Sequence, residues 1–167
     1  AQVSPQLLSL SEEVVYNTEN QVVFIKFKPG ADIPETNTAE FIRKYFAPGE
    51  NVRLEEFRSE TDAIGYTHRR FKIYSNNVEL YNKVIVSHGT NGKLVSINGD
   101  LSPITKSGSA FTLSEKQALG FALNKINARK YKWENKEEEA HLRRALNQPE
   151  FSYAPKGKKI LFEKGKS

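Results

Sequence analysis

Three histidines are the side chains of this sequence best suited to bind a metal ion or transfer a proton: His68, His88 and His141. The commonest zinc-protease motif places two histidines four residues apart on one helix, with a glutamate between them. No such spacing occurs here. His141 follows Glu137 by one helical turn, but the charges around that pair favour a solvent-exposed helix face. His68 and His88 could still meet across a sheet, yet no third ligand accompanies them, so we predict no metal and no cofactor.

The sequence also lacks a residue in a setting typical of a catalytic nucleophile. The sequence contains no cysteine, which excludes thiol nucleophiles, disulfides and thiolate zinc sites. No serine lies in a Gly-x-Ser-x-Gly turn or three residues before a lysine. Gly165-Lys166-Ser167 is similar to the end of a phosphate-binding loop, but Ile160 replaces the first glycine of that motif. Neighbouring carboxylates such as Glu55 and Glu56 would point to opposite faces of a strand. We therefore predict that this chain is not an enzyme.

The composition suits one compact domain or two small lobes. The 167 residues are 38% hydrophobic and 27% charged, which is enough apolar material for a buried core. No apolar run approaches the roughly 20 residues that a membrane-spanning helix needs. The first ten residues also lack the basic and long apolar segments of a signal peptide. A soluble chain without a membrane partner is expected.

The charge permits an acidic partner without specifying one. Lysine and arginine number 25 against 20 aspartates and glutamates, for a formal charge of +5. Acidic residues are interspersed with the basic pairs, and no nucleic-acid recognition motif is present. Solvated surfaces are the favoured interpretation, no nucleic-acid partner is expected, and a polyanion-binding domain is a weaker alternative.

Hydrophobic periodicity predicts that the chain begins its folded part with a strand and a helix. Residues 21–28 alternate as a strand and end at the turn Pro29-Gly30. Asn37 can then cap a helix whose apolar residues recur at helical spacing and which ends at Pro48-Gly49. A strand followed by a covering helix is typical of an α+β fold.

Four further strands should complete an antiparallel sheet. Phe57 breaks the alternation of the first of them, which predicts a bulge there. Asn91-Gly92 is a strong hairpin signal, for a turn type in which both central residues have positive φ. Asn98-Gly99 should end the sheet. The predicted strands are 52–58, 66–74, 78–88 and 93–98.

A second unit should follow a short linker. Thr112 with Glu115 forms a capping box before one apolar helical stripe, and Asn135 with Glu138 forms another before a helix that stops at Pro149. A last two-stranded hairpin is expected around Lys156-Gly157. The predicted organisation is an N-terminal extension at 1–20, a first domain at 21–101, a linker at 102–110 and a second lobe at 111–167.

Several of these segments together resemble one family, the fungalysin/thermolysin propeptide (FTP) domain of secreted zinc metalloproteases. That family shows a Gly-x-x-His segment, an aromatic-led strand, a glycine-containing turn, a strand ending in Val-x-His, and then Asn-Gly-Lys-Val-x-Ser-x-Asn-Gly. Asparagine replaces the expected family glycine at Asn77 and Asn82, and it tolerates left-handed backbone best among other residues. The matching segments here are Gly65 to His68, Phe71 to Tyr74, Asn76 to Leu80, Val84 to His88 and Asn91 to Gly99.

Residues outside that core extend the resemblance. The segment from Lys130 to Arg144, followed by FSYAPKGKKILF, is similar to the PepSY-like second part of such pro-regions. The resemblance implies a cystatin-like fold, with a helix packed on a curved antiparallel sheet, in two small lobes. It also implies a secreted or periplasmic location, as part of a zymogen.

The function implied by the resemblance is that of a non-catalytic propeptide. Such a chain acts as an intramolecular chaperone and transient inhibitor, and its partner is the catalytic domain of its own metalloprotease precursor. A freestanding secreted protease inhibitor or binding module is the main alternative. The candidate protease contacts are Trp133, Lys156, Lys158 and Lys159. The motif residues with expected structural roles are Gly65, His68, Phe71, Tyr74, Asn77, Asn82, His88, Asn91, Gly92, Asn98 and Gly99.

Overall fold

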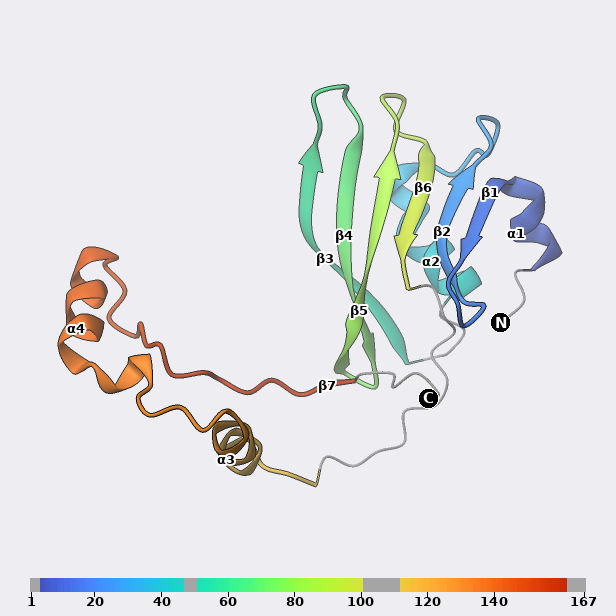
Figure 1. Cartoon of the computed structure of the whole chain (residues 1–167). Coiled ribbons are helices and arrows are strands. Elements are labelled where there is room, and N and C mark those ends of the chain that lie inside the picture. Colours follow the sequence, from blue (N-terminus) through green and yellow to red (C-terminus); the bar gives the residue numbers. More distant parts are fainter. Residues whose placement is uncertain (1–3, 47–50, 101–111, 162–167) are drawn as a thin grey trace. The chain divides into compact units, whose positions relative to one another are not determined.

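The computed structural model describes residues 4–46, 51–100 and 112–161 (Figure 1). The chain divides into two compact units, one formed by residues 1–108 with 160–167 and one by residues 109–159. None of the helices in the described ranges is both long and apolar enough to cross a membrane. The architecture is mixed α+β, as the periodicity predicted, and the expected linker at 102–110 lies outside the described residues.

The first unit is built on a sheet in which β1, β2, β6, β5, β4 and β3 lie side by side in that order. These strands pair antiparallel throughout, and a short seventh strand, β7, pairs parallel with the beginning of β5. The meander from β3 to β6 agrees closely with the predicted strands. The strands are β1 (Ser11–Tyr16), β2 (Val22–Phe27), β3 (Val52–Thr61), β4 (Thr67–Ser75), β5 (Val78–His88), β6 (Leu94–Gly99) and β7 (Ile160–Leu161).

One helix packs on this sheet and closes its core. A short 3-10 turn, η1 (Glu35–Asn37), leads into α2 (Thr38–Phe46), which lies against one face of the sheet (Figure 1). Phe41 meets Phe27 of β2 edge to face, with ring centroids 5.5 Å apart. Each apolar side chain buried in this way contributes about 1.5–3 kcal/mol. The fully buried aliphatic side chains at the centre are Leu7, Ile25, Ile42, Val84, Val86 and Ile97.

The N-terminal residues belong to this unit, which corrects the predicted extension at 1–20. Ser4 caps α1 (Pro5–Leu10) by accepting a hydrogen bond from the Leu7 N–H at 3.2 Å. Leu7 is 1% exposed and belongs to the core. β1 then pairs with β2, so it forms one edge of the sheet. Only Ser11 of β1 is buried, so hydrophobic alternation along this strand is too weak to predict it.

Turns join the strands of the meander, and asparagine supplies much of their unusual backbone. Asn76 and Asn77 have φ of 48° and 63° and connect β4 to β5, as expected for a two-residue turn of the primed type. The predicted bulge at Phe57 is confirmed, because the pairing of β3 with β4 shifts between Glu56 and Arg58.

Two of the turn predictions are wrong. Asn82 lies inside β5 without positive φ, and its side chain instead donates to Asp100 Oδ2 at 2.5 Å. In the β5–β6 turn, Gly92 has φ of 72° but Asn91 does not share the positive sign. The Gly92 N–H donates to the Gly89 carbonyl at 2.9 Å, which is the pattern of a longer loop that ends in a left-handed glycine.

The second unit is helical in its described residues. α3 (Glu115–Ile126) and α4 (Lys136–Ala145) flank a 3-10 turn, η2 (Lys132–Glu134). Asn135 caps α4 as predicted, by accepting from the Glu138 N–H at 3.2 Å. The capping box of α3 uses Ser114 with Gln117 in place of the predicted Thr112 and Glu115.

The predicted final hairpin around Lys156-Gly157 does not form. Residues 151–159 contain no strand, and β7 pairs with β5 of the first unit. Side chains of α4 hold the beginning of this segment, because Arg143 Nε donates to the Phe151 carbonyl at 2.7 Å. The expected helix-on-strands arrangement is therefore correct for the first unit and wrong for the described part of the second.

The left-handed turn predicts how one position responds to substitution. Asn77→Gly should leave the free energy of unfolding nearly unchanged. Asn77→Val should lower it by about 1–2 kcal/mol, since a β-branched residue is strained at positive φ. Asn98→Val is the matched control, because Asn98 lies on an extended strand, and it should be neutral. Urea unfolding of the three variants measures this, and equal losses for both valine variants would show that backbone conformation is not the cause.

Candidate functional site

The structure separates the histidines that the sequence left as possible partners. In the pairing of β4 with β5, His68 lies opposite Ser87 and Thr67 lies opposite His88. Because side chains alternate along a strand, His68 and His88 point to opposite faces of the sheet. His141 is exposed on α4 of the second unit. Among the described residues, no group of three or more histidines, aspartates and glutamates is placed to hold a metal ion.

His68 joins two other polar side chains on the outer face of the sheet, the face opposite α2. Its Nε2 lies 3.0 Å from Asp62 Oδ2, and its Nδ1 lies 2.9 Å from Ser87 Oγ. The other carboxylate oxygen of Asp62 accepts the N–H groups of Ile64 and Tyr66, each at 3.0 Å. The hydrogen bond from His68, and then those two N–H groups, lower the pKa of Asp62.

This Asp62–His68–Ser87 row has the residue types of a hydrolase triad but lacks its geometry. In such triads the serine hydroxyl meets Nε2 and the aspartate meets Nδ1, whereas here the two ring nitrogens are exchanged. Ser87 also lies in a strand that is paired on both sides, with His68 and with Ser96. The neighbouring backbone N–H groups therefore serve the sheet and cannot form an oxyanion hole. The row instead fixes the turn between β3 and β4.

His88 is the buried counterpart of His68, and it connects the helix to the sheet. Its side chain is 0% exposed, and Nε2 shares a hydrogen bond of 2.8 Å with the hydroxyl of Thr38, the first residue of α2. Nδ1 is buried and has no hydrogen-bond partner in the described structure. Burial lowers the pKa of His88, and the charge of Arg69 lowers it further, while Glu35 acts in the opposite direction.

The remaining motif residues of the meander also have structural positions. Phe71 is buried in the core, and the Tyr74 ring lies 4.0 Å from the guanidinium carbon of Arg53. Gly65 has φ of 87° in the β3–β4 turn. Gly99 has φ of 137°, and a Cβ there would lie 2.3 Å from the Lys83 carbonyl oxygen. Asn98 is exposed on β6.

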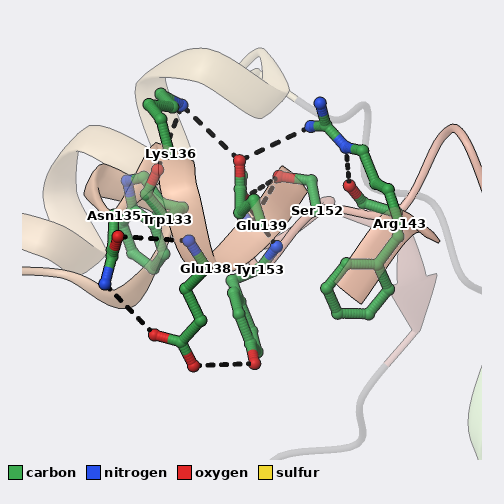
Figure 2. Close-up of polar contacts among 10 residues, drawn as sticks. Trp133, Asn135, Lys136, Glu138, Glu139, Arg143, Ser152 and Tyr153 are labelled. Atoms are coloured by element: carbon green, nitrogen blue, oxygen red, sulfur yellow. Dashed lines mark hydrogen bonds and ion pairs between the residues drawn. The ribbon is translucent and has the colours of Figure 1, made fainter. Parts of the chain in front are cut away.

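The second unit contains a polar cluster centred on Glu139 of α4 (Figure 2). This carboxylate is 1% exposed and accepts from the Ser152 hydroxyl at 2.7 Å and the Tyr153 N–H at 3.0 Å. Arg143 and Lys136 provide the compensating charge, with nitrogens 3.5 Å and 3.6 Å from Oε2. The cluster therefore holds residues 152 and 153 against α4.

Hydrogen bonding keeps Glu139 ionised despite its burial. The Ser152 hydroxyl, followed by the Tyr153 N–H, lowers the pKa of the carboxyl group. Because the pKa of Glu139 is lower in the folded state than in the unfolded state, its ionised form stabilises the fold. This contribution is present above about pH 4.5 and is lost as the pH falls through the folded-state pKa. Glu139 was missed because it is the last of three consecutive glutamates. Its one-turn spacing from Arg143 is the only sequence signal that favours it over its neighbours.

The four residues predicted to contact the protease all lie in the second unit. The described contacts of Trp133 are with Tyr131 and Lys136 and involve none of the other three. Trp133 is half-buried and stacks on Tyr131, with centroids 4.5 Å apart and planes 11° from parallel. Its carbonyl accepts from Lys136 Nζ at 3.0 Å. The side chains of Lys156, Lys158 and Lys159 are exposed in the segment after α4. These positions make a structural role for Trp133 clear, and contact with a protease stays a prediction.

The lowered pKa of His88 predicts that the first unit loses stability in mild acid. Unfolded histidine takes up a proton near pH 6.5, whereas buried His88 does so only at lower pH. The contribution of neutral His88 to the free energy of unfolding is therefore fully present above pH 6.5, and it should decrease as the pH falls below that value. Urea unfolding at pH 7.5 and 5.5 tests this, with a smaller loss expected in His88→Leu. His141→Gln, which changes an exposed histidine, should behave like the original chain. If His88→Leu loses as much free energy of unfolding between pH 7.5 and 5.5 as the original chain, His88 is not the cause.

One segment of the chain matches the model of a known family. No curated protein and no solved structure matches this chain. Residues 54–101, which include the strands from most of β3 to β6, match the model of the Fungalysin/Thermolysin Propeptide Motif. All the predicted motif residues from Gly65 to Gly99 lie within that match, and Trp133 and the three lysines lie outside it. This part of the chain is therefore similar to an FTP-type propeptide motif.

Proposed function

We propose that this chain is the non-catalytic pro-region of a fungalysin/thermolysin-type zinc metalloprotease. In this role it assists the folding of the catalytic domain and blocks the active-site cleft until it is cleaved off. The observation that carries the proposal is the propeptide-motif match over residues 54–101. A precursor containing this chain would be exported, and the zinc would belong to the catalytic domain.

The arrangement of the first unit supports a binding role. Within this unit the core is confined to the α2 side of the sheet, and the opposite face carries polar side chains that could contact a partner. β4 presents His68, Arg70, Lys72 and Tyr74 on that outer face, where each is half-buried. A sheet that is ordered by its own core loses little conformational entropy when it binds. Such a surface can stabilise the native protease by binding it in preference to the unfolded chain.

Finer features of the fold belong to the same proposal. We assign the first unit to the cystatin-like class on the basis of one helix packed on an antiparallel sheet, and we assign the second unit to the PepSY-like part of the pro-region. Covalent linkage within a precursor would raise the effective concentration of the two parts to about millimolar. The separated chain therefore needs only moderate affinity to act as an inhibitor before cleavage.

Inhibition in trans tests the proposal. The purified chain, added to the mature metalloprotease from its own precursor, should reduce peptide hydrolysis at micromolar concentration. It should hydrolyse no peptide itself. The denatured protease, refolded by dilution, should also recover more activity with the chain than without it, because binding favours the native state.

An unrelated basic domain of similar size is the control for both measurements, since it reproduces the net charge without the propeptide motif. The proposal fails if the chain neither inhibits the protease nor raises its refolding yield above that control. A freestanding binding module would then be the better account.

A further inference from the structure

Among residues 112–159, the described part of the second unit, no hydrophobic side chain is fully buried. All fifteen buried hydrophobic side chains of the described structure lie in the first unit, and the one buried residue of the second unit is Glu139. A unit of this size normally needs a core, a disulfide or a partner to hold its fold. The described contacts of the second unit are mainly helix caps, the Glu139 cluster and aromatic pairs. Its helices are therefore short of apolar partners.

α3 shows where the missing contacts should be made. Phe121 is 64% exposed and Ile126 is 66% exposed. Ala118 and Ala122 are exposed between them at one-turn spacing, so a partner could approach this face of the helix closely. Leu119 and Leu123 are half-buried on the adjoining face. The face formed by Ala118, Phe121, Ala122 and Ile126 is called the α3 face below.

The net charge of the chain is confined to this unit. Residues 109–159 contain 11 lysines and arginines against six glutamates and no aspartate, and so account for the whole formal charge of +5. Lys125, Arg129 and Lys130 are exposed at and just after the C-terminal end of α3. No salt bridge between described residues involves any of the three, so their charges are available to a partner.

We propose that the α3 face docks in an apolar groove with an acidic rim on the catalytic domain of the precursor. The apolar side chains at positions 118, 121, 122 and 126 would enter the groove, as in other helix-in-groove complexes. Lys125, Arg129 and Lys130 would face the acidic rim, which steers the approach and sets the orientation. This inference rests on the proposed function and adds to it the surface and the chemistry of its complement.

A protein groove fits the α3 face better than a lipid surface does. Helices that lie in a membrane interface present a broad, continuous apolar face with several large side chains. The α3 face has two large apolar residues, separated by alanines, with Lys125 beside them. Nucleic-acid binding would leave Phe121 and Ile126 without partners, since neither phosphate nor solvent compensates an exposed aliphatic surface.

Binding of the full chain to the mature protease of its precursor tests the inference. The double variant Phe121→Gln and Ile126→Gln removes the apolar contacts and keeps good helix propensity. Its affinity should fall about 10- to 30-fold, as for loss of a central apolar anchor. Ile64→Gln is the matched control. Ile64 is 71% exposed, but it lies in the β3–β4 turn of the first unit, and this variant should bind normally.

Each outcome decides a specific question. Circular dichroism must show equal helix content in all variants. A second double variant, Arg129→Gln with Lys130→Gln, should reduce the salt dependence of the association rate. Loss of affinity in the double variant alone supports the α3 face. If the double variant binds as tightly as the original chain, the α3 face is not the docking surface, and the propeptide role is unaffected. The same conclusion follows if Ile64→Gln loses as much affinity as the double variant. If the original chain does not bind the protease, the proposed function fails as well. Binding to anionic vesicles that is lost in the double variant, with protease binding unchanged, would assign the face to a membrane.

Discussion

The register of β4 against β5 is the constraint on which the first unit depends. Because His68 is opposite Ser87, His88 must face the other side of the sheet, under α2. A shift of one residue along β5 would turn Val84, Val86 and His88 out of the core and Ser87 into it. The turn at Asn76 and Asn77 sets this register at one end, and the Asp62–His68–Ser87 row fixes the turn beyond the other. Residue types that could suggest catalysis are therefore used here to hold strands in place.

The two units differ in how their folds are stabilised. The first has a helix closed over a sheet and a full set of buried aliphatic residues. The second relies on a satisfied buried carboxylate, capped helix ends and a stacked Tyr131–Trp133 pair. Polar contacts of this kind specify a local arrangement but contribute less net stability than apolar burial. Under the proposed function, the second unit would gain its apolar contacts from the protease.

Much of the first unit could be predicted from the sequence, because alternation and helical periodicity report directly which side chains are buried. The position of α2, the β3 bulge and the β3–β6 meander follow from such patterns, whereas the predicted helix end at Pro48-Gly49 lies outside the described residues. Local patterns failed where a long-range contact decides the outcome. β1 is recognisable only as the partner of β2, β7 pairs with a strand some 80 residues earlier, and Glu139 depends on residues 152 and 153. Asn82 shows the converse error, since a family expectation of glycine predicted positive φ where a side-chain hydrogen bond to Asp100 occurs.

The most direct test of this account is amide hydrogen exchange of the full chain, alone and in complex with the mature protease of its precursor. The account predicts that the central amides of β4 and β5 are protected in both states, because the core of the first unit exists without a partner. Amides of α3, residues 115–126, should exchange rapidly in the free chain and become protected in the complex. Strong protection of α3 in the free chain, or no change there on binding, would contradict the claim that the second unit is completed by its protease.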